Sequence, residues 1–472
     1  MSKCAIVISD PKSDFTSAIR RAGVDCFICV RVDRIYTIDN DIITTIKSDE
    51  LTTEISISIP DLRNDLLKMY PLIDRWVSNR VSISDTIEAC LVYTCSLIKI
   101  IATNKNCFAI LETGAPHHLF TYCLHTALKY LKIPTYYLYP NGIDQSLNIF
   151  RGIEKLDVEI EPQLDRTSSN NIQEYVSEVL SDTKFVPKDS SYVLKSKSNR
   201  SSIPVFIQHT KVLINRALVR KKQHAADIYL ELPELSLREV FNNLRKQKRY
   251  LKNIKAKTSN FDISQISSTD IVYVGHMLPE ATSFPDSINY PGEIDVLLDL
   301  RNRFPNSIIF YKEHPAINVF SEVGHIHQQG LHKNTAFLKL MDTLNINFIP
   351  IDLHMSELRA VKCLFATKTG RVAIENSIKS SKTIIYGYPF YGINLPMTAH
   401  VSSLKRYDDV NELTEQIKIS SPEKVVEYLS NRFNYRIINP GIGIARQADA
   451  ITYPHEIEVL MASLLTSCSD VG

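Results

Sequence analysis

The sequence predicts an α/β protein with two doubly wound domains, and three observations support this. At 472 residues the chain is too long for one compact core, while its 44% hydrophobic content is enough to bury two. Strand-like and helix-like runs alternate in both halves, as expected for parallel sheets covered by helices. Between the halves lies a segment of different composition. We therefore expect two Rossmann-like domains that face a central cleft.

The N-terminal domain, predicted over residues 1–156, contains four hydrophobic strand patterns. They begin with "CAIVISD" and "CFICVRV" and continue with "CFAILET" and "PTYYLYPN". Helical patterns separate them, most clearly in residues 85–103 and 118–131. The order of these runs predicts a parallel α/β domain.

The C-terminal domain, predicted over residues 268–425, repeats this alternation more regularly. Its expected strands begin at Asp270, Ser307, Ile346, Cys363 and Lys382, with one helical run after each of the first four. Nine alternating elements predict a doubly wound sheet. The remaining residues, 426–472, are expected to form helices that brace the two domains.

The segment predicted to link the domains, residues 157–267, starts acidic and becomes basic. From Lys195 to Lys257 it holds sixteen Lys or Arg against four Asp or Glu, much of it at helical spacing. One interpretation is a solvated helical linker or insertion. The other is a cationic face that contacts anionic lipid or a polyanionic acceptor.

Charge and cysteine content restrict the class of protein. Lys and Arg total 54 and Asp and Glu total 52, which gives a net charge of +2. This small charge argues against a positive electrostatic field over the whole protein that would attract nucleic acid or a membrane. The N-terminus has no apolar signal core, and the apolar run 90–102 is interrupted by Lys99, so we expect a cytoplasmic protein. The nine cysteines favour buried thiols, and the CxxC of Cys26 and Cys29 lies within a strand pattern.

The stretch "IIFYKEHPAIN" ends a buried strand on charged residues. In open α/β sheets ligands bind beyond the carboxyl ends of the strands. Lys312 and His314 are therefore expected to reach an anionic ligand in the crevice without desolvation in the core, and Pro315 to stop the strand. The alternative is a histidine that is simply hydrogen-bonded in a turn.

A second stretch, "ATKTGRVAIENSI", combines hydroxyls, a glycine and a helix start. Thr367 and Thr369 offer hydroxyls, and Gly370 allows close backbone approach. A helix that starts at about Arg371 would add N–H groups and its positive dipole end, which predicts a phosphate or carboxylate cradle. Glu375, one turn further, is placed to accept hydrogen bonds from ribose hydroxyls. Ordinary capping of a crossover helix is the alternative.

A third stretch, "GHMLPEATSFPDS", is a long loop after the first strand of the C-terminal domain. Glu280, Thr282 and Ser283 are expected to face the crevice, or else to cap the helix after Pro291. Two other patterns are weaker. His325, His327 and His332 lack the spacing of a metal site, and Asp39-Asn40-Asp41 lies in a predicted turn.

Four stretches together resemble a known family. "LPEATSFP", "YKEHP", "TKTGRVAIENSI" and "IIYGYPFYG", in this order, are similar to the capsular polysaccharide biosynthesis family that contains the bacterial β-Kdo transferases. The resemblance also touches "TGAPHHLFTYCLHTALKYLKIPTYYLYP" and covers about half of the chain. It implies the two-domain GT-B architecture.

The resemblance also implies an activity and site residues. Family members are glycosyltransferases that resemble enzymes using CMP-sugars. Their nucleotide phosphate is held by elements that match His314-Pro315 and Thr369-Gly370, together with Glu375 and Glu280. The chain departs from the family pattern at Leu278, Arg371 and Ile374, which puts the identity of the sugar in doubt.

The leading hypothesis is a glycosyltransferase of bacterial capsule or lipopolysaccharide synthesis. It would transfer a sugar, first of all an acidic one such as Kdo from a CMP donor, to a glycan or glycolipid. Lys312 and His314 would stabilise the leaving phosphate, and His117 or Glu112 of the first domain would act on the acceptor hydroxyl. No cofactor, metal or nucleic acid is expected, and peripheral contact with the inner face of the cytoplasmic membrane stays open.

Three alternatives remain at this stage. A CDP-polyol phosphotransferase of the teichoic type also presents a His-Pro after a strand, and a sugar-nucleotide 2-epimerase shares the architecture. A noncatalytic scaffold that binds polyanions or lipid through the basic segment is the third. The sequence does not decide the sugar, the acceptor, the stereochemical outcome or the oligomeric state.

Overall fold

The structure is a computed structural model, and it describes part of the chain. The described residues are 4–8, 26–30, 35–39, 42–46, 57–70, 72–73, 82–102, 108–111, 116, 119–140, 143, 147–152, 170–181, 237–276, 287, 289–318, 334–433 and 436–437. The chain divides into two compact units. Unit 1 comprises residues 1–172, 224–233 and 430–472, and unit 2 comprises residues 173–223 and 234–429.

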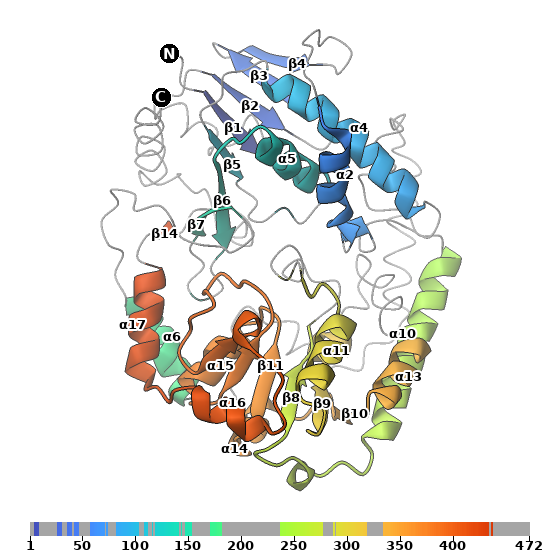
Figure 1. Ribbon diagram of the computed structural model, residues 1–472, viewed down its shortest axis with the longest axis vertical. Coiled ribbons are helices and arrows are strands. Elements are labelled where there is room, and N and C mark those ends of the chain that lie inside the picture. The colour runs from blue at the N-terminus through green and yellow to red at the C-terminus, as the bar shows by residue number, and fades with distance from the viewer. Residues whose placement is uncertain are drawn as a thin grey trace. The chain divides into compact units, whose positions relative to one another are not determined.

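Unit 1 is built on an eight-stranded mixed sheet of order β14-β7-β6-β5-β1-β2-β3-β4 (Figure 1). Its strands are β1 (Cys4–Ile8), β2 (Cys26–Val30), β3 (Ile35–Asp39), β4 (Ile42–Ile46), β5 (Phe108–Leu111), β6 (Thr135–Pro140), β7 (Leu147–Arg151) and β14 (Arg436–Ile437). The four strands β2, β1, β5 and β6 are parallel, and antiparallel strands flank them on both sides. The four predicted strands therefore form the centre of this sheet.

The described helices of unit 1 include α2 (Ile59–Leu67), α4 (Ile83–Ala102) and α5 (Leu119–Tyr130). The helical patterns of 85–103 and 118–131 are confirmed, since α4 and α5 cover them within two residues at each end. In α4 the apolar positions, among them Cys90, Leu97 and Ile101, are buried, which explains why a run this apolar forms a core helix.

Unit 2 is built on a six-stranded sheet of order β10-β9-β8-β11-β12-β13. Its strands are β8 (Ile271–Val274), β9 (Ile309–Lys312), β10 (Ile346–Ile349), β11 (Leu364–Thr367), β12 (Thr383–Ile385) and β13 (Thr398–His400), and all their pairings are parallel. Numbered along the chain, this is the order 3-2-1-4-5-6 of a Rossmann sheet. The chain reverses direction across the sheet between β8 and β11.

Helices cover both faces of this sheet. They are α6 (Asn170–Ser181), α10 (Leu237–Lys257), α11 (Glu293–Arg303), α13 (Thr335–Thr343), α14 (Met355–Ala360), α15 (Val372–Ile378), α16 (Val410–Gln416) and α17 (Pro422–Arg432). Alternate strand residues point to opposite faces. Ile271 and Tyr273 pack in a core with α10, α11, α13 and α16, whereas Val272 packs on the other face with α14.

Every element predicted for residues 268–389 is present, so the predicted α/β class with two Rossmann-like units is confirmed. Local sequence explains the helix starts. Asn334 accepts the backbone N–H groups of Ala336 and Phe337 at the start of α13, and Asp409 accepts that of Asn411 at α16. The side chains therefore supply acceptors that the first turn of a helix lacks.

Helix α10 corrects the idea of a solvated linker for its own residues. Tyr250 and Ile254 are buried in the core of unit 2, and the Gln247 amide donates to the carbonyl of Ile317 at 2.6 Å. Figure 1 shows α10 beside α13 and the sheet edge. Residues 195–236, the rest of the predicted basic segment, lie outside the described residues.

Two sequence expectations about class can be compared with the described residues. The cysteines described with their side chains, Cys90, Cys95, Cys123 and Cys363, are all free thiols, as predicted. Among the described helices, none combines the length and the apolar character needed to cross a membrane.

Candidate functional site

The candidate site lies at the carboxyl ends of β8, β9 and β11. Val274 of β8 pairs with Lys312 of β9, and the N–H of Gly275 donates to the Lys312 carbonyl at 2.9 Å. On the other side, Tyr273 of β8 pairs with Ala366 of β11. Because β8 and β11 flank the reversal in strand order, ligands of such sheets bind at this edge.

His276, which the sequence analysis did not select, connects the ends of β8 and β11. Its Nε2 accepts the backbone N–H of Thr369 at 3.3 Å and lies 3.4 Å from the Thr367 hydroxyl. All three residues are buried. A Gly-His pair directly after a strand was the only signal in the sequence. The predicted hydroxyls of Thr367 and Thr369 therefore lie in a packed strand connection, next to an imidazole.

Gly370 lies against this imidazole. A Cβ at Gly370 would lie 3.3 Å from the Thr367 hydroxyl oxygen and 3.4 Å from His276 Nε2. The carbonyl of Gly370 accepts the Tyr391 hydroxyl at 3.0 Å. Helix α15 then starts at Val372 with Arg371 as its N-cap, which confirms the predicted helix start. Little space is left for a side chain where close backbone approach was predicted.

Two buried glutamates hold the backbone at two strand ends in the same way. Glu293 Oε1 accepts the N–H of His276 at 3.0 Å, and Glu313 Oε1 accepts the N–H of His314 at 2.9 Å. Each glutamate is 1% exposed. Val274 of β8 and Lys312 of β9 are paired across the sheet. His276 comes two residues after Val274, and His314 comes two residues after Lys312. The backbone of both histidines is thus fixed by a buried carboxylate.

Glu313 is also the centre of a tyrosine cluster. Its carboxylate accepts the Tyr250 hydroxyl at 2.6 Å and the Tyr311 hydroxyl at 3.3 Å. Burial, followed by the charge of Glu313, raises the pKa of both phenols well above the usual value. The phenols therefore stay protonated and act as donors to the carboxylate. Sequence reasoning did not select Glu313, although its position in "YKEHP" was quoted.

The expectation that Lys312 reaches the crevice without desolvation is wrong. Lys312 is 3% exposed, and its ammonium donates to the carbonyls of Pro350 and Ile351 at 3.1 and 2.5 Å. Burial lowers the pKa of Lys312 to about 8, against the opposing effect of Glu313 and Asp352. The turn after β10 takes up this side chain, because β10 is the neighbour of β9 in the sheet.

His314 and Pro315 follow the predicted strand end. Strand β9 ends at Lys312, and a 3₁₀ helix begins at Pro315 and runs to Asn318, so the proline does end the strand region. His314 is half-buried, in contrast to Lys312 and Glu313 before it. Among "KEH", the imidazole is therefore the side chain with the most contact to solvent.

Glu375 takes part in an ion pair. Its Oε2 lies 2.8 Å from Arg359 of α14, whose Nε donates to Asn376 at 2.7 Å. The paired side chains are 9% and 12% exposed, so water screens the pair only weakly. Any ribose contact would have to coexist with this pair.

A second buried lysine lies between the site's two threonines. Lys368 is 0% exposed, and its ammonium donates to the carbonyl of Pro291 at 2.9 Å. The sequence analysis selected the hydroxyls of Thr367 and Thr369 on either side of it and did not select Lys368. The contact ties the end of β11 to the start of α11, which also supplies Glu293.

Several predicted residues cannot be placed. Glu280, Thr282 and Ser283, the pair Glu112 and His117, and His325, His327 and His332 all lie outside the described residues. Within the described part of the chain, no group of three His, Cys, Asp or Glu side chains is arranged to hold a metal ion.

Comparisons with known proteins give distant likenesses only. No protein-family model matches the chain, and no curated protein matches it. A β-Kdo 2,7-transferase of Thermosulfurimonas dismutans is similar at 17% identity and a TM-score of 0.22, over 41% of this chain and 65% of that one, so the match spans less than two thirds of its length.

Two further solved structures are similar over nearly full length. A UDP-GlcNAc 2-epimerase of Methanocaldococcus jannaschii in complex with UDP-GlcNAc and UDP matches at 13% identity and a TM-score of 0.23, over 98% of this chain and 99% of that one. The wall teichoic acid polymerase TagF matches at 10% identity and a TM-score of 0.18, over 100% of this chain and 90% of that one. The assignment of the α/β class rests on the strand order of each unit.

Proposed function

We propose that the chain is a nucleotide-sugar-dependent glycosyltransferase whose unit 2 binds the donor nucleotide at the ends of β8, β9 and β11. One observation carries the proposal: His276, Thr369 and Gly370 meet at the reversal point of a Rossmann-ordered sheet. Ligands of such sheets bind outside this point. Two of the stretches that resemble the β-Kdo transferase family, "YKEHP" and "TKTGRVAIENSI", lie at the ends of β9 and β11.

In the proposed mechanism His314 stabilises the leaving nucleotide. Negative charge grows on the leaving phosphate, so donors fixed before the reaction stabilise the transition state more than the ground state. The Glu313 contact fixes the His314 backbone, which reduces the reorganisation needed during transfer. The buried Lys312 ammonium is committed to two carbonyls and is not assigned a direct phosphate contact.

The remaining roles follow from the sequence motifs. Glu280 and Thr282 would complete the donor site, and Glu375 would contact the ribose beside its ion pair with Arg359. His117 or Glu112 would accept the proton of the acceptor hydroxyl. A CMP-linked acidic sugar such as Kdo is the first donor to test, with a glycan or glycolipid as acceptor. CDP-polyol phosphotransfer and 2-epimerisation of a UDP-sugar are the rival activities.

Thermal-shift measurements with CMP, CDP and UDP separate these three activities. A nucleotide at about 100 times its dissociation constant should stabilise the protein by roughly 2.7 kcal/mol. We expect CMP to act at the lowest concentration, and the His314→Ala variant to need more of it. His400→Ala serves as the control, since that histidine is the last residue of β13, the edge strand of the sheet. If no nucleotide stabilises the parent protein, the proposal is wrong.

A further inference from the structure

The outer face of α10 is the most strongly charged surface among the described helices of unit 2. Its 21 residues contain eight Lys or Arg and a single acidic residue, Glu239. All eight cations are exposed: Arg238, Arg245, Lys246, Lys248, Arg249, Lys252, Lys255 and Lys257. The helix alone therefore carries a formal charge of +7 (8 − 1), in a chain whose net charge is +2.

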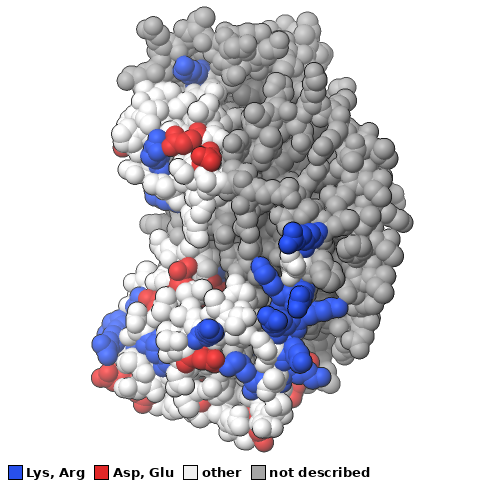
Figure 2. All heavy atoms as spheres, turned by 90° about the vertical axis from the view of Figure 1, so that its right-hand side faces the viewer, with Lys and Arg blue, Asp and Glu red and all other residues white. Residues whose placement is uncertain are grey.

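The packing of α10 explains why these charges gather on one side. Gln247, Tyr250 and Ile254 are buried against unit 2, and at about 100° per residue they lie within a narrow stripe of the helix. Arg245, Arg249 and Lys252 lie on the opposite stripe. Figure 2 faces this side of the molecule and shows Lys and Arg side chains crowded together, with few acidic ones among them.

From this face we infer that α10 binds the surface of an anionic membrane. An extended row of cations is complementary to a surface of dense negative charge, and each Lys or Arg near such a surface adds to the attraction. The exposed described residues of α10 include no aromatic side chain, which disfavours single-stranded nucleic acid, because that ligand is bound by stacking on aromatic rings.

The same packing determines the kind of membrane contact. Amphipathic helices that insert into lipid use their apolar face, but the apolar face of α10 is buried in the core of unit 2. Binding is then electrostatic, without insertion, and weakens as salt screens the charges. This goes beyond the proposed transferase activity and does not depend on it.

Co-sedimentation of the full chain with phosphatidylcholine vesicles, with or without phosphatidylglycerol, tests the inference. The test variant replaces Arg245, Arg249 and Lys252 by Gln. A matched control replaces three exposed cations elsewhere in unit 2: Arg406 after β13, Lys418 after α16 and Lys424 in α17. Both variants then lose the same charge. We expect the parent and the control to bind the anionic vesicles, and the α10 variant to bind roughly 100-fold more weakly.

Three results would overturn the inference. In the first, the parent protein stays in the supernatant with anionic vesicles at low salt. In the second, the control variant loses vesicle binding as strongly as the α10 variant does. In the third, the parent binds soluble polyphosphate but no vesicle, which would make a polyanionic polymer the partner. An unfolding midpoint close to that of the parent, measured without nucleotide, shows that the α10 variant is folded and keeps the two proposals separate.

Discussion

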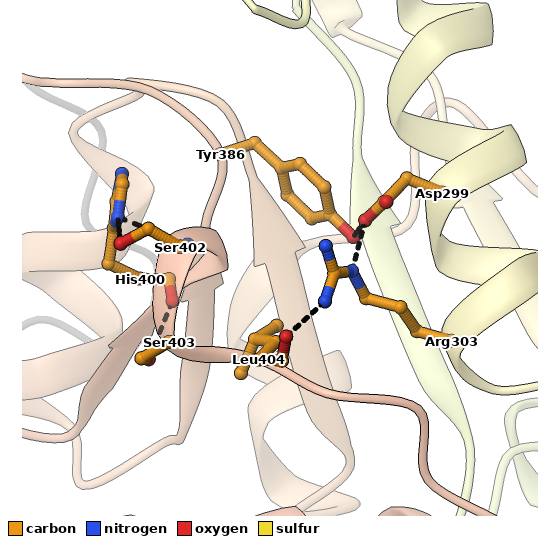
Figure 3. Close-up of polar contacts among 7 residues, drawn as sticks. All are labelled: Asp299, Arg303, Tyr386, His400, Ser402, Ser403 and Leu404. Atoms are coloured by element: carbon orange, nitrogen blue, oxygen red, sulfur yellow. Dashed lines mark hydrogen bonds and ion pairs between the residues drawn. The ribbon is translucent and has the colours of Figure 1, made fainter.

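Two polar clusters of unit 2 differ in what their side chains hold. The strand-end cluster consists of His276, Glu293, Glu313, Thr367 and Thr369. The β12–β13 cluster consists of two groups, one of Asp299, Arg303 and Tyr386 and the other of His400 and Ser402 (Figure 3). In the second cluster the side chains mostly hold one another. In the first, the two carboxylates hold the backbone of the strand ends.

Each group of the β12–β13 cluster joins neighbouring segments of the fold. Asp299 of α11 accepts from Arg303 at 2.6 Å and from Tyr386 at 2.9 Å, and Arg303 also donates to the Leu404 carbonyl. The His400 ring contacts the Ser402 hydroxyl through Nδ1 at 2.7 Å and the Gly387 carbonyl through Nε2 at 3.2 Å. Burial lowers the pKa of His400. Both ring nitrogens are thus used by the fold.

This comparison shows that a buried histidine at a strand end does not by itself mark a functional site. Each cluster contains a buried histidine at a strand end: His276 comes two residues after β8, and His400 is the last residue of β13. The strand-end cluster differs in its position at the reversal of strand order, and in a half-buried histidine, His314, next to it. Topology therefore selects the strand-end cluster as the candidate site.

The largest effect is expected from Glu313→Ala. This change leaves the Tyr250 hydroxyl, the Tyr311 hydroxyl and the His314 N–H without their acceptor. Because each unsatisfied buried donor costs about 1 to 3 kcal/mol, the free energy of unfolding should fall by about 4 kcal/mol. Denaturant titration measures it, with the isosteric Glu313→Gln as the control. A loss below about 1 kcal/mol would show that the cluster is not held by Glu313.

Exchanging the two histidines for alanine compares the clusters directly. His314→Ala should weaken nucleotide binding by about 2 kcal/mol, or roughly 30-fold, because a hydrogen bond to a charged phosphate is lost. His400→Ala should instead lower stability and leave nucleotide affinity unchanged, since its ring bonds only to the protein's own groups. Calorimetric titration measures both affinities. Equal nucleotide affinity in parent and His314→Ala would remove His314 from the site.

Most of the fold of unit 2 could be predicted from the sequence, because its strands are short apolar runs and its helices have clear starts. Sequence alone did not indicate the antiparallel strands β3, β4 and β7 of unit 1. These pairings depend on contacts between strands rather than on the period of one segment. The packing of α10 against unit 2 was also not predicted. The segment is rich in Lys and Arg, so its few apolar positions, among them Tyr250 and Ile254, did not stand out as buried.

The candidate site was predicted only in part. Strand ends could be located from the apolar runs, so Thr369, Gly370 and His314 were correctly expected next to the ends of β11 and β9. Whether a charged side chain at a strand end faces solvent or a neighbouring turn depends on tertiary packing, and Lys312 shows the difference. His276 and Glu293 act across 17 residues of sequence, a contact that no local pattern reveals.

The pH dependence of stability should reveal the buried Lys312. Its pKa of about 8 lies below that of an unfolded lysine, so between pH 8 and about 10 the unfolded state binds more protons. Stability therefore rises with pH in this window, by about 1 to 2 kcal/mol between pH 8 and about 9.5. The raised pKa values of the buried tyrosines act in the opposite direction, but only above about pH 10.

Lys312→Met provides the reference, since it removes the titrating group and keeps much of the side-chain volume. The difference between the unfolding free energies of parent and variant, measured at several pH values, isolates the contribution of Lys312. A difference that does not change with pH would mean that Lys312 titrates normally, and hence that its ammonium is not desolvated in solution.

The smallest effect is expected from Gly370→Ala. The new Cβ would lie 3.3 Å from the Thr367 hydroxyl oxygen and 3.4 Å from His276 Nε2, which is tight but allows a small shift. We expect a loss of stability below about 1 kcal/mol, because only a few tenths of an ångström must be accommodated. Gly370→Val adds two methyl groups at the same point and should weaken nucleotide binding measurably more, whereas Thr367→Ala removes only a hydroxyl. If Gly370→Val binds the nucleotide as well as the parent does, the connection between β11 and α15 does not approach the ligand, and the strand-end cluster would be structural like the β12–β13 cluster.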